Sequence, residues 1–272
     1  MGAMTPELWP ARLHHLRRDS PKPEPLARFY GELLGDRVEA LPDASWLVAG
    51  HGRRLVVGQG AAGSVPYFAF QLDDNAQLDA LRRAWKGEPF TSPLLEQAFA
   101  RTDPDGRRIA FGVPKEIESG EGLPGRLQHF VCATQRLPEM VAFYRKLGML
   151  ESDRVLEGDS LTAVFLRSDP EHHSFAAFRA PESRADHHCY ETNGWLDIRD
   201  WADRMARLKI PLWWGPGRHG PGNNLFFMIE DPDGHKVEFS AELELMPKDM
   251  AHRTWPHEQR TLNLWGSAWM RS

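Results

Sequence analysis

The sequence has few cysteines, no run of basic residues and no long apolar segment. Only Cys132 and Cys189 are present among 272 residues, which excludes a framework of several disulfides and predicts buried, free thiols in a reducing compartment. Acidic residues outnumber basic ones by 38 to 33, so the chain lacks the positive charge of nucleic-acid-binding proteins. No apolar run approaches the roughly 20 residues that span a bilayer. Without a secretory signal, we expect a cytoplasmic protein that binds neither nucleic acid nor membrane.

A long internal repeat is present instead. His15 and His129 occupy matching positions 114 residues apart, and Tyr30 and Tyr144 keep the same spacing, so the copies align here without a gap. Repetition over this length indicates duplicated structural units. The matching stretches are Ala11-Arg-Leu-His-His-Leu with Leu26-Ala-Arg-Phe-Tyr, and Gly125-Arg-Leu-Gln-His-Phe with Val141-Ala-Phe-Tyr.

A second repeated motif and a change in composition predict the domain boundaries. Asp-Pro-Asp-Gly occurs at Asp103 and again at Asp231, 128 residues later, so the second copy is slightly longer. Between the copies, a segment rich in Gly, Glu and Ser is typical of a linker. We expect an N-terminal domain over residues 1–114, a linker over 115–125, a C-terminal domain over 126–244 and a tail over 245–272.

Hydrophobic spacing predicts the same order of elements in both copies. Helical spacing runs from Leu26 to Leu34 before Gly35, and from Met140 to Leu147 before Gly148. Each copy therefore has a strand, a helix and further strands, twice over, which is an α+β pattern. In the second copy we expect strands at 160–167, 173–178, 188–191, 224–229 and 236–240, and a further helix from Ile198 to Met205.

Three residues of the second copy combine metal-binding side chains with strand positions. Period-two alternation predicts that His129, His188 and Glu238 face one interior side of a curved sheet. Two imidazoles and one carboxylate form a facial triad, which suits non-haem Fe(II) oxygen chemistry because coordination positions stay free. The first copy keeps only one such side chain, so we expect it to be a scaffold without metal. Its matching positions are His15, Tyr67 and Ala110.

Several stretches of the second copy carry a specific resemblance. They are Arg126-Leu-Gln-His-Phe-Val, His172-His-Ser-Phe-Ala-Ala-Phe, Asp186-His-His-Cys-Tyr-Glu, Gly215-Pro-Gly-Arg-His-Gly-Pro-Gly-Asn-Asn and Asp231-Pro-Asp-Gly-His-Lys-Val-Glu-Phe. Together they resemble the type I extradiol ring-cleavage dioxygenases of the vicinal oxygen chelate superfamily, with the last stretch most similar to the homoprotocatechuate 2,3-dioxygenase branch. The resemblance implies two vicinal-oxygen-chelate domains, each of two βαβββ units forming an incomplete barrel, with metal only in the C-terminal domain.

The resemblance also implies roles for individual residues. It assigns His129, His188 and Glu238 as ligands of Fe(II), with Mn(II) as the alternative ion. It matches His173 to a histidine beside the oxygen site. It matches His219 to the histidine that contacts the substrate hydroxyl and moves protons.

The expected substrate contacts depart from the family pattern at one position. Met228 stands where the family usually has a tyrosine, and a thioether cannot donate that hydrogen bond. Tyr190 lies on the same strand face as His188 and could supply this hydrogen bond in place of the missing tyrosine. Asn223, in the loop that carries His219, is a further expected substrate contact. Trp213 and Trp214 would form aromatic walls for a planar ring, with a core or interface role as the alternative. By alternation, the neighbouring His172 and His187 should point away from the site.

These features predict a non-haem Fe(II) extradiol dioxygenase that inserts O₂ into a catechol-type aromatic diol with meta ring cleavage. A metal-dependent lyase or isomerase of the same superfamily is the alternative that Met228 favours, and a non-catalytic aromatic-binding protein is the third.

The tail from Trp255 to Gly266 is unusually apolar. Similar tails in the family cover the active site or a subunit contact, whereas simple packing against the sheet is the alternative. A homo-oligomer is expected on this ground.

Overall fold

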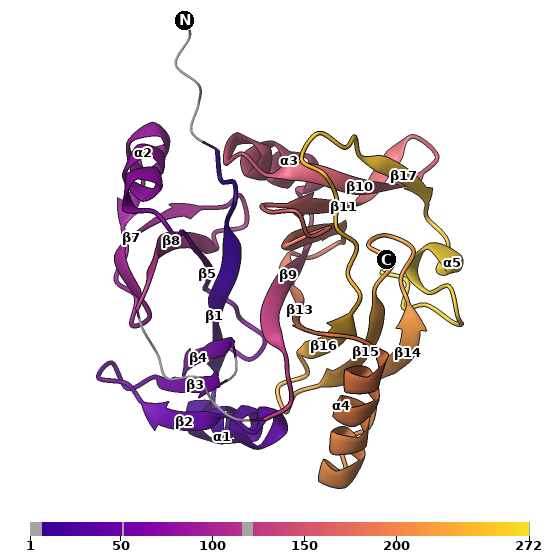
Figure 1. Cartoon of the computed structure of the whole chain (residues 1–272), viewed down its shortest axis with the longest axis horizontal. Helices are drawn as coiled ribbons and strands as arrows, with labels where there is room; N and C mark the ends of the chain where they lie inside the picture. The colour runs from indigo at the N-terminus through magenta and orange to yellow at the C-terminus, as the bar shows by residue number, and fades with distance from the viewer. Residues whose placement is uncertain (1–6, 51, 116–121, 272) are drawn as a thin grey trace, which may run out of the picture.

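Two mixed β-sheets lie side by side in the computed structural model, which describes residues 7–50, 52–115 and 122–271 (Figure 1). Each sheet is built from two copies of one βαβββ unit. The two units of the first sheet are, in chain order, β1 (Arg12–Ser20), α1 (Pro23–Leu34), β2 (Arg37–Ala40), β3 (Trp46–Gly50) and β4 (Arg53–Gln59), then β5 (Tyr67–Gln71), α2 (Asn75–Trp85), β6 (Glu88–Pro89), β7 (Leu95–Thr102) and β8 (Arg108–Pro114).

The second sheet repeats this order and adds a tail. Its units are β9 (Arg126–Thr134), α3 (Leu137–Lys146), β10 (Leu150–Glu157), β11 (Ser160–Arg167) and β12 (Phe175–Arg179), then β13 (Arg184–Thr192), α4 (Trp195–Leu208), β14 (Trp214–Arg218), β15 (Leu225–Glu230) and β16 (Lys236–Ala241). The tail contributes β17 (Arg253–Pro256) and α5 (Gln259–Leu262). The predicted α+β class and the four βαβββ units are confirmed.

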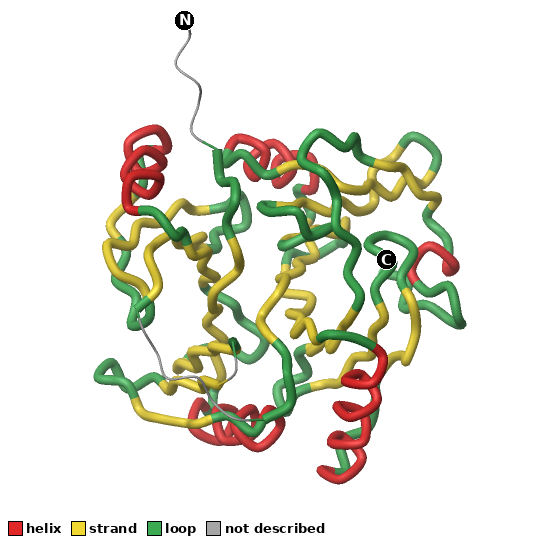
Figure 2. The backbone as a smooth tube through the Cα atoms, viewed as in Figure 1, coloured by secondary structure: helices red, strands yellow, loops and turns green. Residues whose placement is uncertain are grey.

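The order of the strands explains how distant residues meet. The sheets run β2-β3-β4-β1-β5-β8-β7-β6 and β14-β15-β16-β13-β9-β12-β11-β10-β17, so the two units of each sheet join through their first strands. The helices lie around the outside of the sheets (Figure 2). In the second sheet β13 is central, antiparallel to β9 and parallel to β16. These three strands carry the residues of the site.

Local sequence explains the ends of the first helix. Pro23 starts α1, where its missing N–H costs no helical hydrogen bond. Gly35 ends the helix in the left-handed conformation at φ 73°, and its N–H donates to the carbonyl of Gly31. The predicted stop at Gly35 is therefore confirmed.

Aromatic side chains fill the space between the two sheets. The ring of Phe68 on β5 lies 4.8 Å from that of Phe130 and 6.0 Å from that of Phe175, both of the second sheet. All three are fully buried. Burial of this much apolar surface stabilises the contact between the halves. The domain boundaries stay a prediction, and linker residues 116–121 lie outside the described residues.

Two further observations concern the cysteines and the helices. Cys132 and Cys189 are buried and free, as expected. Among the described residues, no helix has both the length and the apolar character that crossing a bilayer requires.

Candidate metal centre and active site

Three neighbouring strands present ligand-type side chains on one face. In the register of the sheet, His129 on β9 pairs with Cys189 on β13, and Cys189 pairs with Glu238 on β16. Directly paired residues share a face, and so do residues two apart on one strand. His187, two positions before Cys189, therefore joins His129 and Glu238 on this face.

The side chains of His129, His187 and Glu238 converge to a single point. The Nε2 atom of His187 lies 3.1 Å from Oε2 of Glu238 and 3.3 Å from Nε2 of His129, and the remaining His129–Glu238 distance is 3.7 Å. Each of these side chains is 5% exposed or less. Ligand atoms at roughly 2.0–2.2 Å from one ion, on neighbouring corners, stand about 3 Å apart. The donor set therefore fits one divalent metal ion.

The assignment of His188 as a ligand is wrong. Its side chain points to the opposite face of β13, where Nδ1 lies 3.0 Å from Nε2 of His235 and the ring lies 5.9 Å from that of Tyr30. His187, which we expected to point away, faces the metal centre instead. Alternation separates the two adjacent histidines but does not say which one faces inward. The pairing of Cys189 with Glu238 decides it.

Cys189 is a competing third ligand on the same face. Its Sγ and the ligand atoms of His129 and Glu238 lie within 4.8 Å of one another. This spacing is wider than the 3.1 and 3.3 Å of His187, and the thiol already donates to Oγ of Ser240 at 3.2 Å. Burial also raises the pKa of the Cys189 thiol well above its ordinary value. We therefore favour His187 as the ligand.

Electrostatics hold Glu238 in its ionised form and favour the protonated form of His187. Burial alone would raise the pKa of Glu238, but hydrogen bonds from His129 and His187 outweigh it and hold that pKa well below its ordinary value. Nδ2 of Asn224 also donates to Oε1 of Glu238 at 3.2 Å. Burial opposes protonation of His187, yet its contacts with Asp186 and Glu238 raise its pKa. The result is an ionised carboxylate, which is the form that binds a cation.

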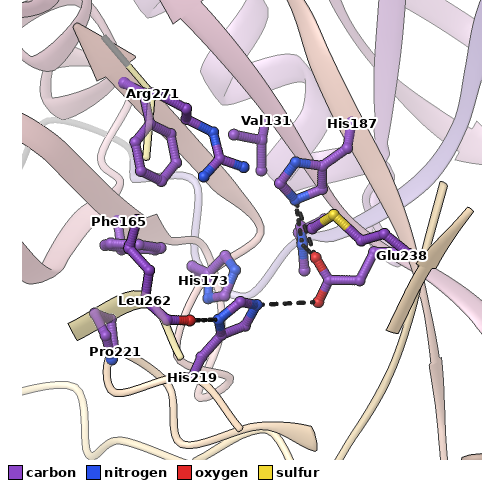
Figure 3. Close-up of a pocket in the computed structure, with 12 residues that line it drawn as sticks. Val131, Phe165, His173, His187, His219, Pro221, Glu238, Leu262 and Arg271 are labelled. Atoms are coloured by element: carbon purple, nitrogen blue, oxygen red, sulfur yellow. Dashed lines mark hydrogen bonds and ion pairs between the residues drawn. The ribbon is translucent and has the colours of Figure 1, made fainter. Parts of the chain in front are cut away.

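His173 and His219 both line the pocket beside this centre (Figure 3). The ring of His173 lies 4.3 Å from that of His129, and its Nδ1 is 2.9 Å from Nδ1 of His172. His219 donates from Nδ1 to the carbonyl of Leu262 at 2.5 Å, which leaves Nε2 3.8 Å from Glu238. Burial lowers the pKa of His219 to about 4 and that of His173 well below its ordinary value. Both are therefore neutral at pH 7.

His172 lies outside the pocket but does not face solvent. It is fully buried, and its Nε2 lies 2.8 Å from Oδ2 of Asp153, whose carboxylate also binds Arg253. The expectation that His172 points away from the site is consistent with this placement. Its buried contact with His173 nevertheless connects it to the pocket.

The rest of the pocket is mostly apolar. The cavity among these side chains is small, about 30 Å³. Met228 is fully buried and lines the pocket. The other apolar lining residues are Val131, Phe165, Phe178, Pro221 and Leu262.

Three of the expected substrate contacts lie elsewhere. Tyr190 does share the face of His188, but that face is turned away from His129 and Glu238, and the Tyr190 ring packs near Phe239. The ring of Trp213 packs against Trp269 at 4.7 Å, beyond the pocket lining. Asn223 is exposed, and it is the next residue, Asn224, that reaches Glu238. The predicted substrate contacts at Tyr190, Trp213 and Asn223 are therefore corrected.

Trp214 stands behind the pocket rather than in its wall. Its ring lies 5.6 Å from that of His219 and 4.5 Å from that of Phe226, and its Nε1 donates to the carbonyl of Ser267. It thus supports His219 and the tail but does not line the cavity. The alternative of a packing role fits it better.

Sequence reasoning missed three residues of the site. Asp186 contacts His187, Asn224 contacts Glu238, and Arg271 lines the pocket. Asp186 stands directly before the histidine pair, which is a weak signal for a polar partner. The last of the three, Arg271, has no local signal because it reaches the site from the far end of the tail.

Comparisons with known proteins agree with this geometry. Residues 126–239 match the model of the Glyoxalase/Bleomycin resistance protein/Dioxygenase superfamily. Metapyrocatechase 2 of Cupriavidus necator is 32% identical over 170 residues, 62% of this chain, and the match spans only about half, 51%, of that relative. The 3-methylcatechol 2,3-dioxygenase of Pseudomonas putida is 26% identical over 72% of this chain and 77% of its own length.

Solved structures extend the likeness to the whole fold. The homoprotocatechuate 2,3-dioxygenase of Arthrobacter globiformis superposes with a TM-score of 0.84 at 23% identity, over 99% of this chain and 91% of that one. At this identity the likeness establishes the two-domain fold. Together these matches confirm the resemblance predicted from the sequence.

Proposed function

Because residues 126–239 belong to the glyoxalase, bleomycin resistance protein and dioxygenase superfamily, we propose that this protein is an Fe(II)-dependent extradiol dioxygenase. In this proposal it cleaves a catechol-type ring next to the diol and incorporates O₂. The observation that carries the proposal is the convergence of His129, His187 and Glu238 under a small pocket that also holds His173 and His219.

His129, His187 and Glu238 would hold the metal. Bound Fe(II) supplies adjacent open positions at which a diol and O₂ come together. Mn(II) has overlapping ligand preferences and is the alternative ion. The chain's part is to keep Glu238 ionised, which its contacts with His129 and His187 favour, and to orient His187 through Asp186. His187 would release the proton on Nε2 when the metal binds, because its two carboxylate contacts raise its pKa.

His219 is the proposed proton acceptor for a substrate hydroxyl. Its Nδ1–H is committed to the carbonyl of Leu262, so Nε2 is unprotonated and faces the pocket beside Glu238. A neutral imidazole in this orientation takes a proton at Nε2 and returns it later in the reaction. His173, neutral and beside His129, is the second polar group available to the reacting molecules.

The lining favours a catechol with a small apolar substituent. Val131, Phe165, Phe178 and Met228 offer no hydrogen bond to a substituent and exclude water from the ring. The charge of Arg271, which also lines the pocket, is already paired with Asp186. A relative is named for 3-methylcatechol, which has such a substituent.

A metal-dependent lyase or isomerase of the same superfamily is the second candidate. Met228 favours it, because the thioether gives no hydrogen bond where a tyrosine hydroxyl would assist ring cleavage. The homo-oligomeric state and the cytoplasmic location stay predictions from the sequence.

Oxygen uptake tests the proposal. Protein prepared without oxygen and loaded with Fe(II) should consume one O₂ for each 3-methylcatechol lost and form a yellow ring-opened product. Metal-free protein is the control. Conversion of a substrate without oxygen uptake would favour the lyase or isomerase. Tight catechol binding with no conversion in the loaded protein would favour the binding protein.

A further inference from the structure

Arg271 forms a two-point ion pair with Asp186. Its Nε lies 3.0 Å from Oδ2 of Asp186 and its Nη2 lies 2.9 Å from Oδ1. The two side chains are 4% and 0% exposed. A planar guanidinium paired in this way has a fixed orientation, and both charges are shielded from water.

Two aromatic rings hold the guanidinium of Arg271 in place. Its central carbon lies 4.1 Å from the ring centre of Phe178 on β12 and 4.0 Å from that of Trp269 in the tail. Cation–π contact on these rings adds to the ion pair. Figure 3 shows the side chain above the pocket, near Val131 and His187.

The carboxylate that Arg271 binds also binds a proposed metal ligand. Nδ1 of His187 lies 2.6 Å from Oδ1 of Asp186, the same oxygen that accepts from Nη2 of Arg271. With its Nδ1–H donated to Asp186, His187 directs the lone pair of Nε2 toward His129 and Glu238. Carboxylate partners of this kind fix the ring orientation of metal-binding histidines.

We propose that Arg271 is a positioning residue that acts through Asp186 to hold His187 in the orientation that binds metal. Asp186 precedes His187 directly, and its carboxylate must turn back toward the ring to accept the hydrogen bond. Arg271 occupies both carboxylate oxygens and so prevents Asp186 from rotating away. The segment after α5 thereby becomes part of the metal site. The inference rests on the proposed function, since it requires metal at His187.

A different role for Arg271 would be direct contact with the substrate, because it lines the pocket. Its pairing with Asp186 argues against this role, since the guanidinium charge is already satisfied. The two roles differ in what they change. A positioning residue changes metal affinity in the absence of substrate, whereas a substrate contact changes only KM.

The test is a metal titration of metal-free protein. Co(II) serves as the probe because it binds nitrogen and oxygen ligands and its visible spectrum reports their geometry. Arg271→Gln and Asp186→Asn should each raise the Kd for Co(II) by about 10- to 100-fold, the range seen for partners of ligating histidines. The double variant should be no worse than Asp186→Asn alone, because both changes act along one path. Arg260→Gln, in the exposed part of the tail, is the matched control and should keep the parental Kd.

The outcomes separate this inference from the proposed function. His187→Ala should abolish Co(II) binding, and if it does not, the proposed metal centre is wrong. If His187→Ala loses the metal but Arg271→Gln keeps the parental Kd and spectrum, only the role of Arg271 is overturned. Additive losses in the double variant would also overturn it. Arg271→Lys keeps the charge but not the two-point geometry, so its Kd for Co(II) should be intermediate. This variant tests the role of Arg271 if Arg271→Gln does not fold.

Discussion

The hydroxyl of Tyr30 on α1 donates a 2.8 Å hydrogen bond to Oδ2 of Asp231, a residue of the other half of the chain. The repeat makes this contact reciprocal, because Tyr144 on α3 donates to Oδ2 of Asp103 at 3.4 Å. Arg18 adds a fully buried ion pair to Asp231. Each Asp-Pro-Asp-Gly turn therefore receives the tyrosine of the opposite half, and the repeated motif joins the two halves.

Replacing Tyr30 with Phe should lower the free energy of unfolding by about 1–2 kcal/mol. The change removes one buried hydrogen bond, while Arg18 still pairs with Asp231. Tyr144→Phe is the matched comparison and should cost less, since its bond is longer. Urea unfolding measures both. A larger loss for Tyr144→Phe, or a loss of metal from Tyr30→Phe, would contradict this account.

The adjacent histidines of β13 should respond in opposite ways to substitution. His187→Ala should lose stoichiometric metal, because its Nε2 lies among the proposed ligand atoms. His188→Asn should keep the metal and lower Tm, because it removes the contact with His235. Metal analysis and thermal unfolding check both. The reverse pattern would restore His188 as the ligand.

Replacing His219 with Ala should lower kcat by roughly 10²- to 10⁴-fold, the range expected for a general acid–base group. The Kd for metal should change little, since the proposed role of His219 is proton transfer rather than ligation. His257→Ala, in the tail and outside this pocket, is the control. Steady-state oxygen uptake gives kcat. Turnover at the parental rate in the His219 variant would remove it from the mechanism.

Stability should fall in mild acid partly because of His14. Burial, aided by Arg54, lowers the pKa of His14 from 6.5 to about 3, so the folded protein keeps it neutral where the unfolded chain takes up a proton. The free energy of unfolding is therefore fully retained above pH 6.5 and falls as the pH drops toward 3. Urea unfolding at pH 7 and pH 5 should show a smaller decrease for His14→Gln than for the parent. The exposed His252→Gln should behave like the parent.

The sequence predicted the helices and strands better than it predicted which face of a strand each side chain occupies. The strand at 160–167 matches β11 at both ends, and the repeat correctly indicated four similar units. The errors at His188 and Asn223 are displacements by one residue from His187 and Asn224. For His188 on β13, a shift of one position exchanges the two faces of the strand, so the error reverses the side on which the residue lies.

Bulges explain why counting along the chain could not correct this. The pairing of β13 with β9 shifts between Ala185 and His187 and again between Cys189 and Tyr190. Before the second sheet is assembled, nothing in the Asp-His-His segment marks which histidine is opposite Glu238. Long-range partners such as Arg271 are missed for the same reason, because only the folded tail brings them near.

The register of the first sheet has a consequence for how the two halves are related. His15 pairs with Ala69, and Ala69 pairs with Ala110, which repeats the arrangement of His129, Cys189 and Glu238. Tyr67 lies two positions before Ala69, as His187 does before Cys189. The backbone of the N-terminal half thus keeps the same arrangement of three neighbouring strands. What separates it from the proposed metal-binding half is side-chain chemistry, because Tyr67 and Ala110 stand at the positions of His187 and Glu238.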